Sequence, residues 1–138
     1  MEYITKTAAE TQKIGERLSA SLKGGEIIAL KGALGAGKTT FIQGIARGLG
    51  IKKRIISPTF IIVRTYRVGK INFYHVDLYR LEGNLEREIE NLGLKDFWGR
   101  PENITVIEWA EKIKRHLPPG TIWIKFKYLS QDKRQITW

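Results

Sequence analysis

The chain has 138 residues, a formal net charge of +10 and no cysteine. This length suits one domain with a substantial core, so we expect a single domain over residues 1–138. Because cysteine is absent, disulfides and thiolate-bound metals are excluded. Residues 1–6 lack the apolar core of a signal peptide, and no apolar run is long enough to span a membrane. We therefore expect a cytoplasmic protein without membrane contact.

Basic and acidic residues are unevenly distributed along the chain. Between Ile27 and Val76 there are nine Lys or Arg and no Asp or Glu, whereas between Asp77 and Glu111 nine acids outnumber four bases. A basic half favours polyanionic partners, such as a nucleotide, RNA or an acidic protein. The alternative is a solvated basic surface that only maintains solubility, and both interpretations stay open.

The first predicted element is a helix that begins near Thr7. Residues 7–10, Thr-Ala-Ala-Glu, resemble a capping box. An apolar stripe with helical spacing follows, formed by Thr11, Ile14, Leu18 and Leu22. Gly24-Gly25 predicts the end of this helix. The β-branched run Glu26–Leu30 then predicts a short buried strand.

Residues 32–39 carry the most specific pattern of the chain. They read Gly-Ala-Leu-Gly-Ala-Gly-Lys-Thr, which is the G-x-x-x-x-G-K-[ST] phosphate-binding loop. The preceding strand and a helix predicted over 40–47, which Gly48 and Gly50 would end, supply the strand–loop–helix context that this motif requires. The alternative is a glycine-rich turn with an exposed lysine. It explains neither the strand predicted before the loop nor the helix predicted after it.

Each residue type in this loop has a physical role. Gly32, Gly35 and Gly37 allow backbone conformations that turn successive N–H groups towards a phosphate, and the following helix adds the positive end of its dipole. Lys38 would reach the β- and γ-phosphates, and the Thr39 hydroxyl would bind Mg²⁺. The loop therefore predicts a site for a nucleotide and magnesium.

The middle and C-terminal elements are predicted from their apolar patterns. Segments 60–66 and 71–76 flank Val68-Gly69-Lys70 and predict a hairpin. Further elements are a short helix marked by Leu85, Ile89 and Leu92, a buried strand over 104–107, a short helix before Pro118, and a last hairpin from 122–128 and 134–138. The predicted fold class is α/β: a P-loop NTPase-like three-layer sandwich with a mixed central sheet containing antiparallel hairpins.

A phosphate loop needs carboxylates that hold Mg²⁺ and order water. Asp77 follows the predicted strand 71–76, and Glu108 follows the strand 104–107. Ligands of α/β sheets bind beyond the carboxyl ends of the strands, which is the edge that the phosphate loop occupies. Either acid could instead be an ordinary residue at a strand end.

Three more side chains near these motifs have alternative interpretations. Thr59, in the loop Ser57-Pro58-Thr59, could reach the γ-phosphate or Mg²⁺ as switch loops do, or could belong to an ordinary proline turn. Trp109 could anchor the core or seal the site beside the phosphates. His75 lies within a predicted strand, and we interpret it as structural rather than catalytic.

Four motifs of the chain resemble the TsaE family, also called YjeE or YdiB. They are the phosphate loop with its flank at 32–41, Ser57–Phe60, His75–Arg80, and Glu108-Trp109. They occur in the order of the family, and the similarity extends from Thr11 to Arg134. The family often has an acidic residue where Ala33 stands; this position is in the variable part of the loop, so we expect altered local charge and retained nucleotide binding.

The resemblance implies a function that composition could not show. Members of the family are bacterial ATPases of tRNA N6-threonylcarbamoyladenosine (t6A) synthesis, which hydrolyse ATP with Mg²⁺ and work with the proteins TsaB and TsaD. TsaD transfers the threonylcarbamoyl group, and the ATPase supports repeated turnover of the complex. Carried over to this chain, Thr39 and Glu108 would hold Mg²⁺, and Asp77 would assist the metal or the attacking water. The implied phosphate contacts are Gly35, Ala36, Gly37, Lys38, Thr39 and Thr40, and the implied nucleoside contacts are Thr7, Thr11 and Arg134.

Two other functions remain open from the sequence. A small-molecule P-loop kinase would use the same Lys38 and Thr39 but would need an acceptor pocket and usually an arginine-bearing lid, for which the chain offers no long insertion. A nucleotide-switched RNA-binding module is permitted by the basic half 27–76, and direct tRNA contact there is a hypothesis. No recognition helix or aromatic RNA-binding signature supports it.

Overall fold

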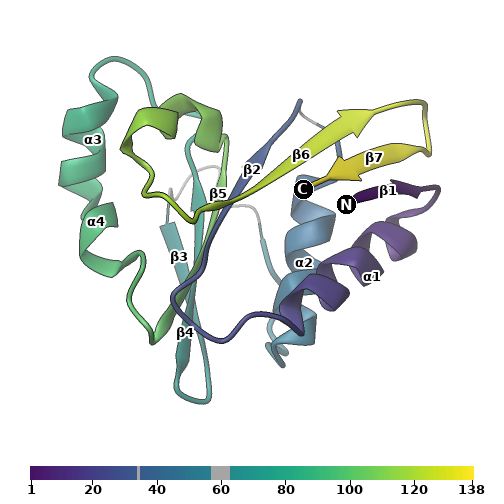
Figure 1. Ribbon diagram of the computed structural model, residues 1–138, viewed down its shortest axis with the longest axis horizontal. Coiled ribbons are helices and arrows are strands. Elements are labelled where there is room, and N and C mark those ends of the chain that lie inside the picture. Colours follow the sequence, from purple (N-terminus) through teal and green to yellow (C-terminus); the bar gives the residue numbers. More distant parts are fainter. Residues whose placement is uncertain (34, 57–62) are drawn as a thin grey trace.

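The computed structural model describes residues 1–33, 35–56 and 63–138 (Figure 1). Within these ranges a seven-stranded sheet has the order β1-β7-β6-β2-β5-β4-β3. The strands are β1 (Glu2–Thr5), β2 (Ile27–Lys31), β3 (Val63–Val68), β4 (Ile71–Asp77), β5 (Asn103–Glu108), β6 (Ile122–Tyr128) and β7 (Arg134–Thr137). The helices are α1 (Ala8–Ser19), α2 (Lys38–Gly48), α3 (Leu85–Leu92), α4 (Leu94–Phe97) and the 3₁₀ helix η1 (Ala110–His116).

The sheet is parallel at its centre and antiparallel at both ends. β2 pairs in parallel with β5 and β6, and β4 pairs in parallel with β5. The pairs β3–β4, β6–β7 and β1–β7 are antiparallel. The predicted α/β class with a mixed sheet and two antiparallel hairpins is therefore confirmed, and the first hairpin turns at Gly69-Lys70. Predicted strand residues 60–62 lie outside the described residues.

Two apolar clusters hold the helices against opposite faces of the sheet (Figure 1). On one face, Phe41, Ile42 and Ile45 of α2 pack with Ile28 and Leu30 of β2, all of them fully buried. On the other face, α3, α4 and η1 cover Ile27 and Ala29 of the same strand. Because β2 is buried on both faces, it reads as a continuous apolar run, as central parallel strands do. The three-layer arrangement of the prediction is present.

Glycines allow α1 and α2 to pack unusually close together. A Cβ atom on Gly44 would lie 2.0 Å from the carbonyl oxygen of Gln12, and one on Gly15 would lie 2.3 Å from that of Phe41. Both obstacles are backbone atoms, which cannot rotate away as a side chain could. Glycine at these two positions therefore sets the distance between the helices.

The structure corrects several element boundaries. α1 ends at Ser19, not at Gly24, because the N–H groups of Ala20, Ser21 and Leu22 bond to carbonyls three residues back and tighten the chain into a turn. The predicted last helix is a 3₁₀ helix. β1 and α4 were not predicted from the sequence; β1 is stabilised by pairing with the distant β7.

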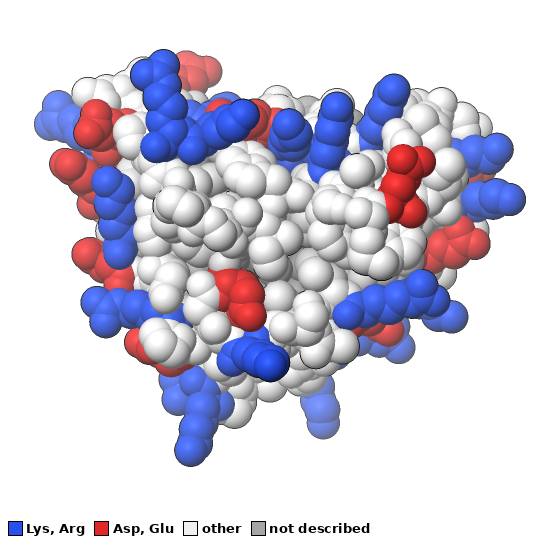
Figure 2. Space-filling view, in the orientation of Figure 1, with Lys and Arg blue, Asp and Glu red and all other residues white. Residues whose placement is uncertain are grey.

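Charged side chains lie mainly around the periphery of the molecule. Figure 2 shows Lys and Arg along most of the outline of the face seen in Figure 1, and fewer charged side chains of either sign in its middle. Of the helices within the described ranges, none is long and apolar enough to cross a membrane.

Candidate functional site

The phosphate loop connects the end of the central strand β2 to the start of α2. Gly35 and Gly37 have φ values of 76° and 95°, in the left-handed region that favours glycine. No described side chain caps the N-terminus of α2. Its first N–H groups therefore remain available for an anion, and the positive end of the helix dipole points to the same place.

A pocket of about 310 Å³ lies in front of this helix terminus. It brings together residues from the phosphate loop, from the ends of β4 and β5, and from β7. Its lining consists of Gly35, Gly37, Lys38, Thr39, Thr40, Asp77, Tyr79, Glu108, Trp109 and Arg134. Nine of these ten were predicted site residues, so residues far apart in the sequence converge as the prediction required.

A second pocket of about 190 Å³ adjoins the first. Gly37, Thr40 and Arg134 line both pockets, and the second adds Thr7 and Thr11 from the start of α1. A ligand with phosphates at the loop could therefore extend its other end towards α1. Thr7 also caps α1, since its hydroxyl accepts a bond of 3.1 Å from the N–H of Glu10.

Three predicted residues have a different placement. Ala36 is fully buried and lines neither pocket, and its N–H donates to the carbonyl of Ala33 at 3.2 Å. Gly32 also lies outside both linings, although its carbonyl accepts a bond from the Lys38 ammonium. Thr59 lies outside the described residues, so its predicted role stays a prediction.

Lys38 is buried and held in place before any ligand binds. Only 5 % of the residue is exposed, its Nζ donates to the Gly32 carbonyl at 2.6 Å, and Nζ lies 3.9 Å from the centre of the Trp109 ring. Burial lowers the pKa of the Lys38 ammonium, while the nearby carboxylates of Glu108, Glu111 and Asp77 act in the opposite direction. Lys38 forms no ion pair with a carboxylate of the described residues, so a bound phosphate would give this buried cation a close anion.

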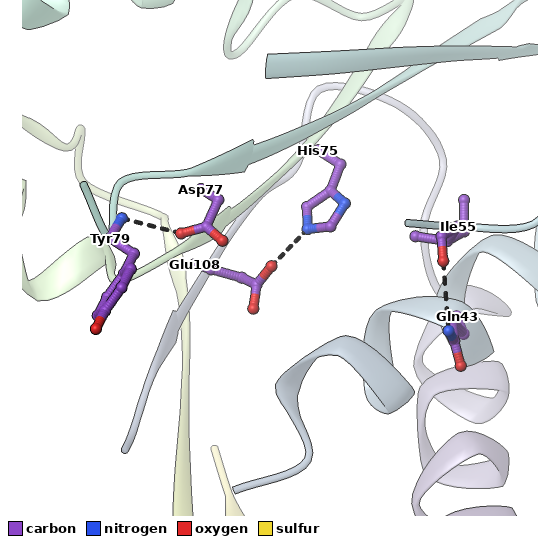
Figure 3. Close-up of polar contacts among 6 residues, drawn as sticks. All are labelled: Gln43, Ile55, His75, Asp77, Tyr79 and Glu108. Atoms are coloured by element: carbon purple, nitrogen blue, oxygen red, sulfur yellow. Dashed lines mark hydrogen bonds and ion pairs between the residues drawn. The ribbon is translucent and has the colours of Figure 1, made fainter. Parts of the chain in front are cut away.

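Asp77 and Glu108 end neighbouring parallel strands and are directly opposite each other in the register. Asp77 is 5 % exposed and Glu108 is 3 % exposed. One oxygen of Asp77 accepts a 2.9 Å bond from the N–H of Tyr79, and Oε2 of Glu108 lies 2.7 Å from Nε2 of His75 (Figure 3). Both side chains line the first pocket, so two buried carboxylates face the phosphate loop.

The residues present fit a magnesium ion that is bound together with phosphates. Thr39, Asp77 and Glu108 offer hard oxygen donors around one pocket, which suits Mg²⁺. Within the described residues there is no group of three or more His, Cys, Asp or Glu side chains that could enclose a metal alone. Mg²⁺ usually takes one or two protein carboxylates and completes its shell with phosphates and water.

The placement of Trp109 is compatible with both of its alternative roles. It lines the first pocket beside Lys38 and also packs against the apolar cluster beneath α3. Its ring lies 5.2 Å from that of Tyr79. With φ 60° and ψ 33°, it is the one non-glycine residue with positive φ in the described part of the chain. This backbone conformation turns the chain sharply after Glu108, and it is uncommon for a bulky residue.

Arg134 links the last hairpin to the phosphate loop. Its Nε donates to the carbonyl of Gly35 at 3.1 Å, and its guanidinium lies 4.6 Å from the Tyr128 ring centre. The Nη1 group donates to three carbonyls of the β6–β7 turn, those of Ser130, Gln131 and Lys133. The guanidinium is therefore fixed at the boundary between the two pockets.

Sequence reasoning missed the contact of His75 with Glu108, and it missed Tyr79 in the pocket lining. His75 and Asp77 are two residues apart on β4, so their side chains share one face of the sheet. That alternation was a signal that His75 lies on the same face of the sheet as Asp77.

Comparison with known proteins agrees with this geometry. The family model described as "Threonylcarbamoyl adenosine biosynthesis protein TsaE" matches residues 5–136. The chain belongs to the TsaE family. The proteins named tRNA threonylcarbamoyladenosine biosynthesis protein TsaE from Bacillus subtilis and from Synechocystis are 39 % and 45 % identical over 137 and 116 residues. These alignments cover 99 % and 82 % of this chain, and 84 % and 72 % of the relatives.

A solved structure extends the likeness to the fold. The crystal structure of Bacillus subtilis YdiB matches with a TM-score of 0.78 and 33 % sequence identity. The match covers 99 % of this chain and 82 % of that protein. The resemblance expected from four motifs is thereby confirmed over nearly the whole chain, and so is the P-loop-like fold.

Proposed function

We propose that the protein binds and hydrolyses ATP with Mg²⁺ as an accessory protein of tRNA t6A synthesis, acting with TsaB and TsaD. Membership of the TsaE family supports the pathway. The observation that carries the ATPase assignment is the placement of the buried Lys38 and the paired carboxylates Asp77 and Glu108 around one phosphate loop. Carboxylates in this place can hold Mg²⁺ and order the attacking water, which hydrolysis requires.

The residues of the pocket have separate roles in the transfer of a phosphoryl group to water. The N–H groups at the start of α2 and the Lys38 ammonium hold the phosphates. Thr39 and the two carboxylates would hold Mg²⁺, which supplies charge neutralisation at the β- and γ-phosphates. Glu108, whose Oε1 has no described partner, would also orient the attacking water. Thr7, Thr11 and Arg134 face the nucleoside end in the second pocket.

The test is ATP hydrolysis by the purified protein, alone and with the TsaB–TsaD pair, each with and without tRNA. We expect slow hydrolysis alone and stimulation by the pair, since the described residues provide no separate arginine that enters the first pocket besides the tethered Arg134. Fast hydrolysis by the isolated protein would contradict the accessory role. Transfer of phosphate to an added small molecule would favour the kinase alternative.

A basic surface at the C-terminal end of α2 supports direct tRNA contact, which we add to the proposal. Two adjoining grooves of about 490 Å³ and 350 Å³ share Gly50, Ile51, Lys52 and Lys53. Arg47 lines the first groove, and Arg67 of β3 lines the second. The side-chain amide of Gln43 on α2 donates a hydrogen bond of 3.4 Å to the carbonyl of Ile55 (Figure 3). This bond holds the segment that follows α2, which carries Lys52 and Lys53, against the helix.

The lysines of these grooves are available to phosphates. Lys52 and Lys53 are exposed and form no ion pair with a described carboxylate, whereas Arg47 is paired with Glu16 at 3.4 Å. Unpaired cations along a groove suit a sugar–phosphate backbone, whose binding is dominated by charge.

Salt-dependent tRNA binding tests this contact. The double variant Lys52→Glu/Lys53→Glu should weaken tRNA binding and reduce the slope of log K against log salt by about 2, roughly 1 for each lysine. The matched control is Lys125→Glu/Lys127→Glu, which makes the same charge change on exposed positions of β6. An equal loss in both double variants would show that net charge alone, not this surface, attracts tRNA. Hydrolysis of ATP without partners should be unchanged in both variants.

A further inference from the structure

We propose that His75 is a positioning residue for ATP hydrolysis, because its Nε2–H holds the Glu108 carboxylate in its working orientation. Nε2 of His75 and Oε2 of Glu108 are 2.7 Å apart (Figure 3). His75 is fully buried, so it cannot touch a ligand itself. This inference rests on the proposed ATPase function and assigns a role to a residue behind its site.

The register of the sheet places His75 behind the carboxylates. His75 is opposite Val106, and Asp77 is opposite Glu108, in the parallel pair β4–β5. Side chains two residues apart on a strand share a face, so His75 lies one step back from the strand ends on the side of the phosphate loop. The first pocket is lined by Asp77 and Glu108 but not by His75.

The hydrogen bonds of His75 indicate which nitrogen of its ring carries the proton. An ionised carboxylate can only accept, so Nε2 of His75 carries the proton that it shares with Glu108. Nδ1 is buried and has no partner among the described residues. A proton on Nδ1 would have no acceptor among the described residues, so these contacts favour the Nε2–H tautomer.

The hydrogen bond from His75 restricts the side chain of Glu108, whose orientation matters most for hydrolysis. Glu108 has several rotatable bonds, and a free glutamate would populate several rotamers. The charge-assisted bond to Oε2 selects one orientation and leaves Oε1 for the pocket.

Packing alone does not explain a histidine at this position. Its neighbours on this face of the sheet include Phe73 and Val106, and both belong to the apolar core. A buried imidazole with one nitrogen that has no partner among the described residues is less favourable there than an apolar side chain of similar size. The polar contact with Glu108 is the feature that an apolar replacement would lose.

The test compares His75→Leu, which cannot donate, with His75→Gln, whose amide can place a donor near the position of Nε2. Hydrolysis is measured with the TsaB–TsaD pair, and ATP affinity is measured separately. We expect kcat to fall about 10- to 100-fold in His75→Leu, the usual loss for a residue that orients a metal-site ligand. ATP affinity should change less than about 3-fold, and His75→Gln should recover most of the rate. The control is His116→Leu, the same change in the other histidine of the chain, on η1.

A second readout does not depend on ATPase activity. Because the chain has only two histidines, long-range ¹H–¹⁵N spectra of the wild type and of His116→Gln identify the His75 ring. We expect the Nε2–H tautomer, and we expect this preference to weaken in Glu108→Ala.

The outcomes distinguish a failure of the proposed ATPase function from a failure of the positioning role of His75. A wild type that does not hydrolyse ATP even with its partners contradicts the proposed function, while the spectra still report on the His75–Glu108 bond. An active wild type with an unchanged kcat in a folded His75→Leu variant overturns the positioning role. The Nδ1–H tautomer, or a folded His75→Gln variant as inactive as His75→Leu, overturns it as well.

Discussion

The close packing of α1 on α2 leads to a prediction about Gly44. In most helices, replacing glycine by alanine stabilises the helix by about 1 kcal/mol. At Gly44 the added Cβ would lie 2.0 Å from the carbonyl oxygen of Gln12, whereas Cβ atoms essentially never approach a neighbour within 3.0 Å. The backbone of α1 must therefore move by about 1 Å, because a carbonyl oxygen cannot rotate away.

The size of the effect follows from two opposing contributions. Overpacking of a filled interface costs about 1–3 kcal/mol, and the high end applies when backbone must move. After the gain in helix propensity of about 1 kcal/mol is subtracted, Gly44→Ala should destabilise the protein by about 1–2 kcal/mol. For a domain of this size the melting temperature should fall by about 3–8 °C.

Thermal unfolding, followed by circular dichroism, measures this change. Lys13→Ala, on the exposed side of α1, is the matched control and should alter the free energy of unfolding by less than about 0.5 kcal/mol. Because Thr7 and Thr11 of α1 line the second pocket with Gly37, a displaced α1 should also weaken ATP binding. A Gly44→Ala variant as stable as the wild type would refute the reasoning that backbone contact sets the helix spacing.

Three further predictions concern the site and its support. Lys38→Ala should weaken ATP binding about 10- to 100-fold, because the phosphates lose a charge-assisted donor; calorimetric titration measures the affinity, and an unchanged value would contradict the role. Glu108→Ala should keep ATP affinity within a few-fold but lower partner-stimulated hydrolysis by about 100-fold or more, because the metal and the attacking water lose the carboxylate that orients them; single-turnover hydrolysis checks this, and full activity would exclude the role. Thr7→Val should lower the free energy of unfolding by about 1 kcal/mol through loss of the N-cap, whereas Thr7→Ser should not; denaturant titrations of both variants provide the comparison.

Local sequence signals predicted the parts of the fold that depend on neighbouring residues. The phosphate loop, the helix at Leu85–Leu92 and both hairpins are each encoded within a short segment, through glycine placement or apolar periodicity. The acids Asp77 and Glu108 were identified because each follows a recognisable strand. These features require no knowledge of distant partners.

The features that sequence reasoning missed depend on contacts between distant segments. β1 forms because Glu2–Thr5 pairs with Arg134–Thr137, and four residues carry too little pattern to predict that. The bond between His75 and Glu108 requires the register of β4 on β5, which no local pattern specifies. The left-handed conformation of Trp109 is likewise imposed by its surroundings, since its residue type does not favour it.

The strand order also constrains when the nucleotide site can form during folding. β2 leads into the phosphate loop, yet its two neighbours in the sheet are β5 and β6, which come much later in the chain. Pairing over such long separations closes large loops and slows folding. Until Asn103–Glu108 has been synthesised and paired, neither Glu108 nor the support of β2 exists, so a ligand of the first pocket has no assembled site in which to stabilise a partly made chain.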